Sequence, residues 1–165
     1  MKYASCASYT LKKTLQMSNY KAITLWEPYA SLILVGAKTV ETRSWLTTYR
    51  GKLLIHAAKR QLTSVQKQLL VQWKENFGIE VALHPGCIVA VCTLKDCVQM
   101  TPELIAQQSE LEIALGDWKV GRYAWILENI SATTPVEVRG AQGLWSITAE
   151  AIGEAVFSRK QLSLL

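Results

Sequence analysis

Three side chains in one short polar run have types and spacing that suit chemistry: Lys38, Glu41 and Arg43. The ammonium of Lys38 can bind phosphate or a developing oxyanion, and Glu41 is a candidate general base. The planar guanidinium of Arg43 suits phosphate or the edge of a base. The alternative is a solvated strand with an ordinary surface ion pair, which contributes only about 0–1 kcal/mol.

Strand periodicity indicates how these groups are arranged. Residues 39–45 are β-branched and aromatic enough to form a strand. Alternation along a strand then puts four side chains on one face: Thr39, Glu41, Arg43 and Trp45. Because Gly36 allows a turn just before this strand, Lys38 is expected at the edge of the same face. We therefore expect Lys38, Glu41 and Arg43 to line one cleft.

Positive charge is concentrated around this run. Residues 36–60 hold six of the chain's 18 Lys and Arg but only one of its 13 Asp and Glu, so their net charge equals the formal +5 of the whole chain. One local positive field favours a negatively charged partner. The residues expected to bind it, besides Lys38, are Arg43, Arg50, Lys59 and Arg60.

Aromatic residues flank the charged segment. Trp26, Tyr29 and Trp45 are near enough in sequence to shape this cleft, with a core role as the alternative for the two tryptophans. Tyr49 offers a further stacking surface. His56 lies inside an apolar run and is interpreted as a core residue, since such histidines are more often satisfied in the core than functional.

The elements that must position these residues alternate irregularly. Strands are predicted at 21–26, 39–45, 52–58, 87–98, 122–130, 136–139 and 144–148. Helices are predicted from Pro28 to Gly36, at 63–77 with a Thr63–Gln66 capping box, at 101–116 and at 150–165. Residues 1–20 are expected to be a mobile tail and 21–149 the domain, with Met17 as an alternative start. This order fits an α+β fold with a mixed, partly closed β-barrel and inserted helices.

Composition excludes several classes. Half of the 165 residues are hydrophobic, which argues against disorder, and the apolar runs are too short to span a bilayer. Cys87, Cys92 and Cys97 are spaced five apart in a predicted strand, so alternation scatters them over both faces and predicts no metal site. With no secretory signal, the cysteines are read as reduced and the protein as cytoplasmic. No cofactor is predicted.

Several separate motifs carry a family resemblance. The pattern G-x-K-x-x-E-x-R fits residues 36–43 and follows Trp26, Pro28 and Tyr29. The motifs YRG (49–51), IHA (55–57), GRYAW (121–125) and GAQGLW (140–145) come after it in that order. From about Ile23 to Trp145 the chain resembles the ASCH domain, the activating-signal-cointegrator homology family of the PUA-like superfamily.

This resemblance implies a PUA-like fold with a cleft between the first helix and the barrel that holds RNA or a nucleotide. It also implies two alternatives. Some small ASCH proteins are hydrolases that deacetylate N4-acetylcytidine; Lys38 matches their lysine, but Glu41 stands where they have threonine. Others resemble ribonucleases, for which Lys38, Glu41 and Tyr49 would be a metal-independent catalytic set. A third possibility is a protein-interaction role, as in coactivator complexes that contain an ASCH domain.

Overall fold

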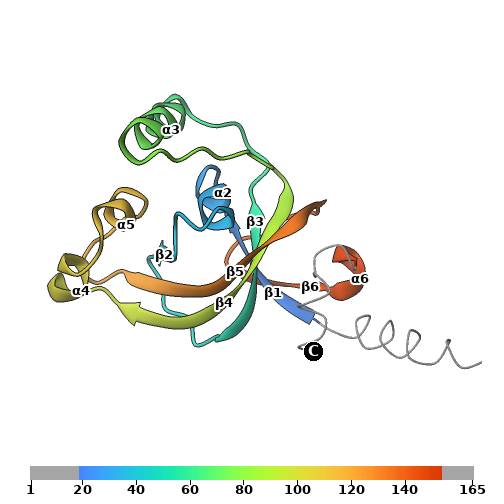
Figure 1. Ribbon diagram of the computed structural model, residues 1–165. Coiled ribbons are helices and arrows are strands. Elements are labelled where there is room, and N and C mark those ends of the chain that lie inside the picture. The colour runs from blue at the N-terminus through green and yellow to red at the C-terminus, as the bar shows by residue number, and fades with distance from the viewer. Residues whose placement is uncertain (1–18, 154–165) are drawn as a thin grey trace, which may run out of the picture.

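The computed structural model describes residues 19–153 (Figure 1). The strands in this range are β1 (Asn19–Leu25), β2 (Val40–Arg43), β3 (Gly51–Ala57), β4 (Cys87–Gln99), β5 (Tyr123–Glu137) and β6 (Leu144–Thr148). The helices are α2 (Tyr29–Leu34), α3 (Ser64–Phe77), α4 (Pro102–Ala106), α5 (Glu110–Ala114) and α6 (Ala149–Ile152). Nearly all of the predicted tail of residues 1–20, the alternative start at Met17 and most of the predicted C-terminal helix therefore lie outside the described residues.

The strands form one mixed sheet in the order β2-β5-β4-β3-β1-β6. β1 and β3 are parallel, and the other neighbouring pairs are antiparallel. The predicted α+β class with a mixed sheet and inserted helices is confirmed, but the predicted barrel closure is not found. Within the described chain, β2 and β6 are the two edges and do not pair with each other. β4 and β5 curve strongly (Figure 1), and their ladder shifts register at three places.

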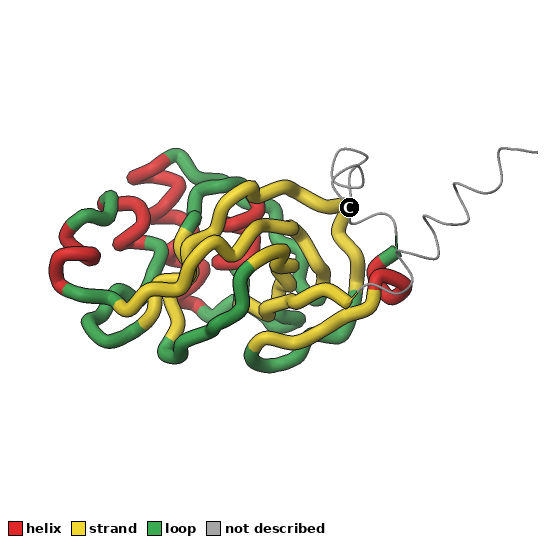
Figure 2. Tube along the Cα trace, turned by 90° about the horizontal axis from the view of Figure 1, so that it is seen from below, coloured by secondary structure: helices red, strands yellow, loops and turns green. Residues whose placement is uncertain are grey.

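The strand β3 lies at the centre of the sheet, between β1 and β4, as its apolar sequence predicted. Leu53 and Ile55 pack on one face in a core cluster that includes residues of α2. Leu54 packs on the other face, in a cluster that includes residues of α6. Figure 2 shows most of the helices gathered at one side of the strands and α6 at the other. Burial on both faces explains why β3 has no polar alternation.

A buried carboxylate holds the entry into α2. Glu27 is only 2% exposed. It accepts hydrogen bonds from the backbone N–H of Ser31 at 3.1 Å, the Ser31 hydroxyl at 2.8 Å and the backbone N–H of His84 at 3.1 Å. These bonds tie the start of the helix to the loop before β4, since the donors come from both segments. The neighbouring Trp26 and Tyr29 are thereby held in place, although sequence analysis did not single out Glu27.

The helix α3 begins as predicted. Thr63 and Gln66 form the expected capping box, with side chain and backbone bonded in both directions. Its apolar stripe is buried only in part: Trp73 is 3% exposed, whereas Val65 is 60% exposed. The helix packs through Trp73, with Leu69 and Leu70 partly buried beside it.

Two predicted boundaries were wrong. The helix expected at 101–116 is split into α4 and α5, because the hydroxyl of Ser109 accepts the backbone N–H of Glu112 and caps a new helix. The strands expected at 122–130 and 136–139 are one strand, β5, which runs through Pro135. Long-range pairing with β4 outweighs the local signal of the proline.

The cysteines of β4 do not scatter over both faces as predicted. Cys92 and Cys97 are buried in the same core cluster, and Cys87 packs against it, because the bulges in the β4–β5 ladder change the alternation. Burial raises the pKa of Cys92 to about 12, so its thiol stays protonated at neutral pH. Between residues 19 and 153 no group of three or more His, Cys, Asp or Glu is placed to hold a metal ion.

No helix in the part of the chain that the structure describes is long and apolar enough to cross a bilayer.

A buried aromatic contact provides a test of the core. Trp125 is fully buried, and its ring packs edge to face against that of Trp45, with the ring centroids 4.7 Å apart. We expect Trp125→Ala to lower the free energy of unfolding by about 3–5 kcal/mol, since a large core side chain is lost. The matched control is Trp26→Ala, whose side chain is 57% exposed, with an expected change within about 0.5 kcal/mol. Urea unfolding measures both, and equal losses would contradict this description of the core.

Candidate functional site

A cavity of about 1070 Å³ opens at the end of the sheet where the parallel strands β1 and β3 both stop. Its walls come from β1, α2, β2, the end of β3 and the segment 137–143 that leads to β6. Crevices outside the carboxyl ends of parallel strands are common ligand sites. The lining residues are Thr24, Leu25, Trp26, Tyr29, Glu41, Arg43, His56, Ala58, Lys59, Glu137, Val138, Arg139, Gly140, Ala141, Gln142 and Gly143.

The edge strand β2 contributes the charged wall. Glu41 and Arg43 share a face, as the strand period predicted, and both line the cavity. Arg43 Nη1 lies 3.5 Å from Glu41 Oε1. Tyr29 stands nearby: burial raises the pKa of its phenol, and the charges of Glu41 and Asp117 raise it further. The phenol therefore stays protonated at neutral pH, beside a carboxylate.

Lys38 does not line the cavity, contrary to prediction. Its side chain is 1% exposed, and Nζ donates to the carbonyl oxygens of Val40 at 2.5 Å and Leu115 at 2.9 Å. Nζ also lies 3.6 Å from Glu41 Oε2. The ammonium is thus occupied behind the wall rather than presented to a ligand, because a buried cation must be paired and hydrogen-bonded. Through this ion pair Lys38 contacts a residue that lines the cavity.

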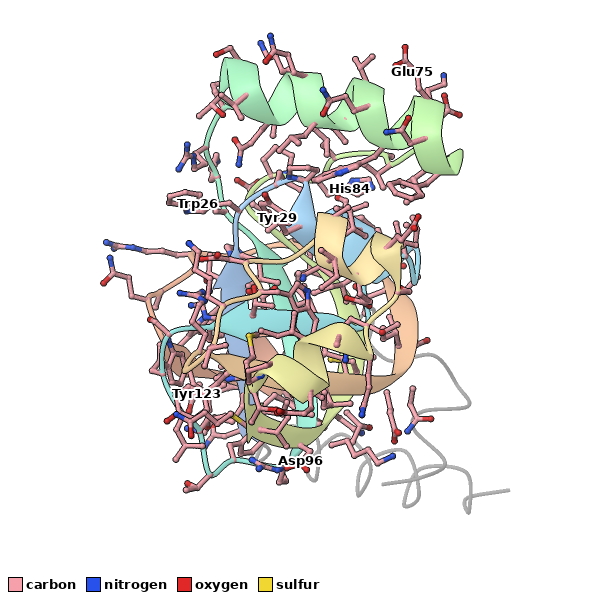
Figure 3. The ribbon with its side chains drawn as sticks, turned by 90° about the vertical axis from the view of Figure 1, so that its left-hand side faces the viewer. Trp26, Tyr29, Glu75, His84, Asp96 and Tyr123 are labelled. Carbon is pink, nitrogen blue, oxygen red and sulfur yellow. The ribbon has the colours of Figure 1, made fainter. Side chains whose placement is uncertain are left out.

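The mouth of the cavity has an exposed aromatic platform. Trp26 is 57% exposed and lies at the edge of the molecule, with Tyr29 further inside (Figure 3). The guanidinium carbon of Arg60 lies 3.9 Å from the centroid of the Trp26 ring. This is a close cation–π geometry. It presents a flat surface and a positive charge side by side.

The other cations at the mouth differ in how far they are neutralised. Lys59 Nζ lies 2.6 Å from Glu137 Oε1, and both side chains are largely exposed. By contrast, Arg60 and Arg139 form no ion pair with an acid among residues 19–153. These two arginines are the cations best placed to meet an incoming anion.

Three predicted site residues lie elsewhere. Trp45 packs edge to face against Trp125. The hydroxyl of Tyr49 donates to the carbonyl of Lys52, and Arg50 pairs with Asp96 at 2.8 Å. In Figure 3, Asp96 lies at the bottom of the molecule, well below Trp26. The structure therefore does not bring Tyr49 to Lys38 and Glu41, the set predicted to be catalytic.

His56, Thr24 and Gly140 form one side of the cavity, here called its floor, which was not predicted from the sequence. His56, interpreted as a core residue, is indeed 2% exposed, but it also lines the cavity. Its Nε2 lies 3.1 Å from the carbonyl oxygen of Val138, which makes Nε2 the protonated nitrogen. Gly140 covers the ring so closely that an added Cβ would lie 2.4 Å from His56 Cε1 and 2.8 Å from Thr24 Oγ1. The sequence did contain one sign of this close approach, the two glycines Gly140 and Gly143 just before Trp145.

Comparison with known proteins adds the following. The sequence pattern of the ASCH domain matches residues 23–141. Activating signal cointegrator 1 of Homo sapiens and that of Mus musculus are each 35% identical over 81 residues, which is 46% of this chain and 14% of theirs. The chain thus spans only a small part of these relatives. Solved structures of ASCH from Zymomonas mobilis give a TM-score of 0.49 at 18% identity, covering 80% of this chain and 90% of that one, and a mutant form gives 0.48 at 17% identity, covering 80% and 92%.

The burial of Lys38 predicts a structural effect. Lys38→Ala leaves two carbonyls without their donor and Glu41 with Arg43 as its remaining cation, so we expect the free energy of unfolding to fall by about 3–5 kcal/mol. Lys59→Ala is the matched control, since Lys59 is exposed and its loss should leave stability nearly unchanged. Urea unfolding compares the two. A Lys38→Ala protein as stable as the wild type would contradict the structural role of Lys38, and Lys38 would again be a candidate ligand contact.

The environment of His56 predicts a pH dependence. Burial lowers the pKa of His56, and the carbonyls of Val138 and Gly86 offset this only in part. The unfolded chain therefore takes up a proton at a higher pH, near 6.5, than the folded chain does. Stability should be fully present above about pH 6.5 and fall as the pH drops towards the folded pKa.

Urea unfolding of the wild type and His56→Gln at a series of pH values measures this effect. The variant should lose less stability than the wild type between neutral and mildly acidic pH. His84→Gln, which removes the chain's other histidine, is the control for loss of an imidazole. Parallel curves for the wild type and His56→Gln would mean that the imidazole does not couple folding to protons.

Proposed function

The chain belongs to the ASCH domain family, which covers residues 23–141, and we propose that it binds single-stranded RNA or a nucleotide in the cavity beside α2. The family resemblance implies such a ligand, held in PUA-like proteins between the first helix and the sheet. Tyr29 of α2 and the end of β1 line this cavity. A volume of about 1070 Å³ is sufficient for a nucleotide.

The observation that carries the proposal is the Trp26 platform. An apolar ring of this size that is 57% exposed at the mouth of a cavity has no role in the core. Stacking of a base on such a ring is worth about 1–3 kcal/mol and tolerates any base. Arg60 beside the ring supplies a charge for the adjacent phosphate.

The charge pattern supports a contact surface for RNA that is smaller than the whole basic segment of residues 36–60. Arg50 and Lys59 are paired with Asp96 and Glu137, so each contributes less net field. The charges of Arg60 and Arg139 are not neutralised by an ion pair with any acid among residues 19–153. The phosphate backbone is therefore proposed to pass along the mouth of the cavity, over these two arginines.

The hydrolytic alternatives gain no support from the geometry. They require Lys38 at the reacting group, and the ribonuclease version also requires Tyr49. Lys38 is occupied by carbonyl acceptors, and Tyr49 does not line the cavity. A protein partner, the third hypothesis, is not favoured by a specific contact in residues 19–153.

Charge reversal at the mouth tests the proposal. Arg60→Glu removes a phosphate contact and the cation on Trp26, so we expect affinity for a short single-stranded RNA of mixed sequence to fall about tenfold or more. The matched control is Lys67→Glu on α3, an exposed lysine outside the cavity with the same change in charge. Fluorescence anisotropy over a series of salt concentrations measures both affinity and the salt slope.

The salt slope should become shallower by about one unit in Arg60→Glu and stay unchanged in Lys67→Glu, because each lost phosphate contact releases one fewer counterion. If both variants lose affinity equally, binding follows net charge and the cavity is not the site. If the wild-type protein binds neither RNA nor mononucleotides, the proposed function is wrong.

A further inference from the structure

Glu41 is a buried carboxylate whose hydrogen-bonding capacity is not used. It is 8% exposed and lines the cavity. Its oxygens lie 3.5 Å from Arg43 and 3.6 Å from Lys38, and no group among residues 19–153 donates a hydrogen bond to them. Glu27, a second buried glutamate that is 2% exposed, accepts three. Because buried carboxylates normally accept hydrogen bonds, Glu41 has acceptor capacity directed at whatever fills the cavity.

Arg43 stands next to this carboxylate on the same face of β2. A guanidinium only donates hydrogen bonds, and an ionised carboxylate only accepts them. Side by side they offer one donor followed by two acceptors. The same order of donor, acceptor and acceptor is found on the pairing edge of cytosine.

We propose that this pair makes the cavity selective for guanine, an inference that rests on the proposed binding of RNA or a nucleotide. The carboxylate of Glu41 accepts the N1–H and the N2 amino group of the base, and Arg43 donates to O6. The ring lies in the cavity lined by Trp26 and Tyr29. The two charges thus read the Watson–Crick edge of an unpaired base.

The other bases leave part of the pair unsatisfied. Adenine and cytosine each place a ring-nitrogen acceptor beside the amino donor, so one carboxylate oxygen faces a lone pair. Uracil has a single N–H between two carbonyls. A site built for hydrogen bonds rejects a base that lacks them, since its buried groups are then left unpaired.

The test uses single-stranded oligouridine with one central guanosine, inosine, adenosine, cytidine or uridine, and the full-length protein. Fluorescence anisotropy should give the tightest binding to guanosine. Inosine lacks only the N2 amino group, so it should bind about tenfold or more weakly, the loss of one hydrogen bond to a charged group. The remaining three should bind no better than inosine. This comparison needs no protein variant and cannot be confused with misfolding.

Glu41→Gln provides the matched change on the protein side. The amide has the size of the carboxylate but offers one acceptor and one donor. The preference for guanosine over adenosine and cytidine should therefore fall about tenfold or more, while affinity for the uridine strand is kept. Arg43→Gln should weaken guanosine and inosine alike, because both carry O6.

The outcomes separate the two proposals. Equal affinity for all five strands, together with the loss expected in Arg60→Glu, would overturn guanine selection and leave RNA binding standing. A wild-type preference for guanosine that Glu41→Gln retains would also overturn it, since another group would then read the base. Absence of binding to every strand and to guanosine monophosphate would overturn both proposals.

Discussion

The burial of one ammonium organises the region that carries the site. Lys38 reaches the carbonyl oxygens of Val40 and Leu115, which lie far apart in the chain. This joins the start of β2 to the end of α5. The same nitrogen lies near Glu41, so the wall of the cavity where Glu41 stands next to Arg43 is supported from behind. A buried charge is costly unless it is fully paired, so the loss of one partner would destabilise the whole group of contacts around Lys38.

The remaining walls depend on the parallel pairing of β1 and β3. Because both strands stop at the same end of the sheet, the residues that follow them meet there. Trp26 comes from one strand end and Arg60 from the other, and they stack although 34 positions separate them. The floor forms where Gly140 passes over the ring of His56, an approach that no side chain would permit. The cavity is thus a consequence of sheet topology.

Local sequence determined most of the elements and the family. The Thr63–Gln66 capping box set the start of α3, the unbroken apolar run of β3 indicated a central strand, and the period of β2 put Glu41 and Arg43 on one face. These features depend on residues only a few positions apart, so they can be predicted directly from the order of residue types in the sequence. The α+β class and the ASCH motifs followed from the order of such segments along the chain.

Only the tertiary structure decided which charged residues belong to the site. Lys38 and Arg50 both lie in the basic segment, yet Lys38 is buried against Leu115 and Arg50 pairs with Asp96 outside the cavity. His56 entered the site through a contact with Val138, and the sheet stayed open because β2 and β6 do not meet. Each of these outcomes depends on a partner distant in sequence, and side-chain period and composition carry no information about such partners.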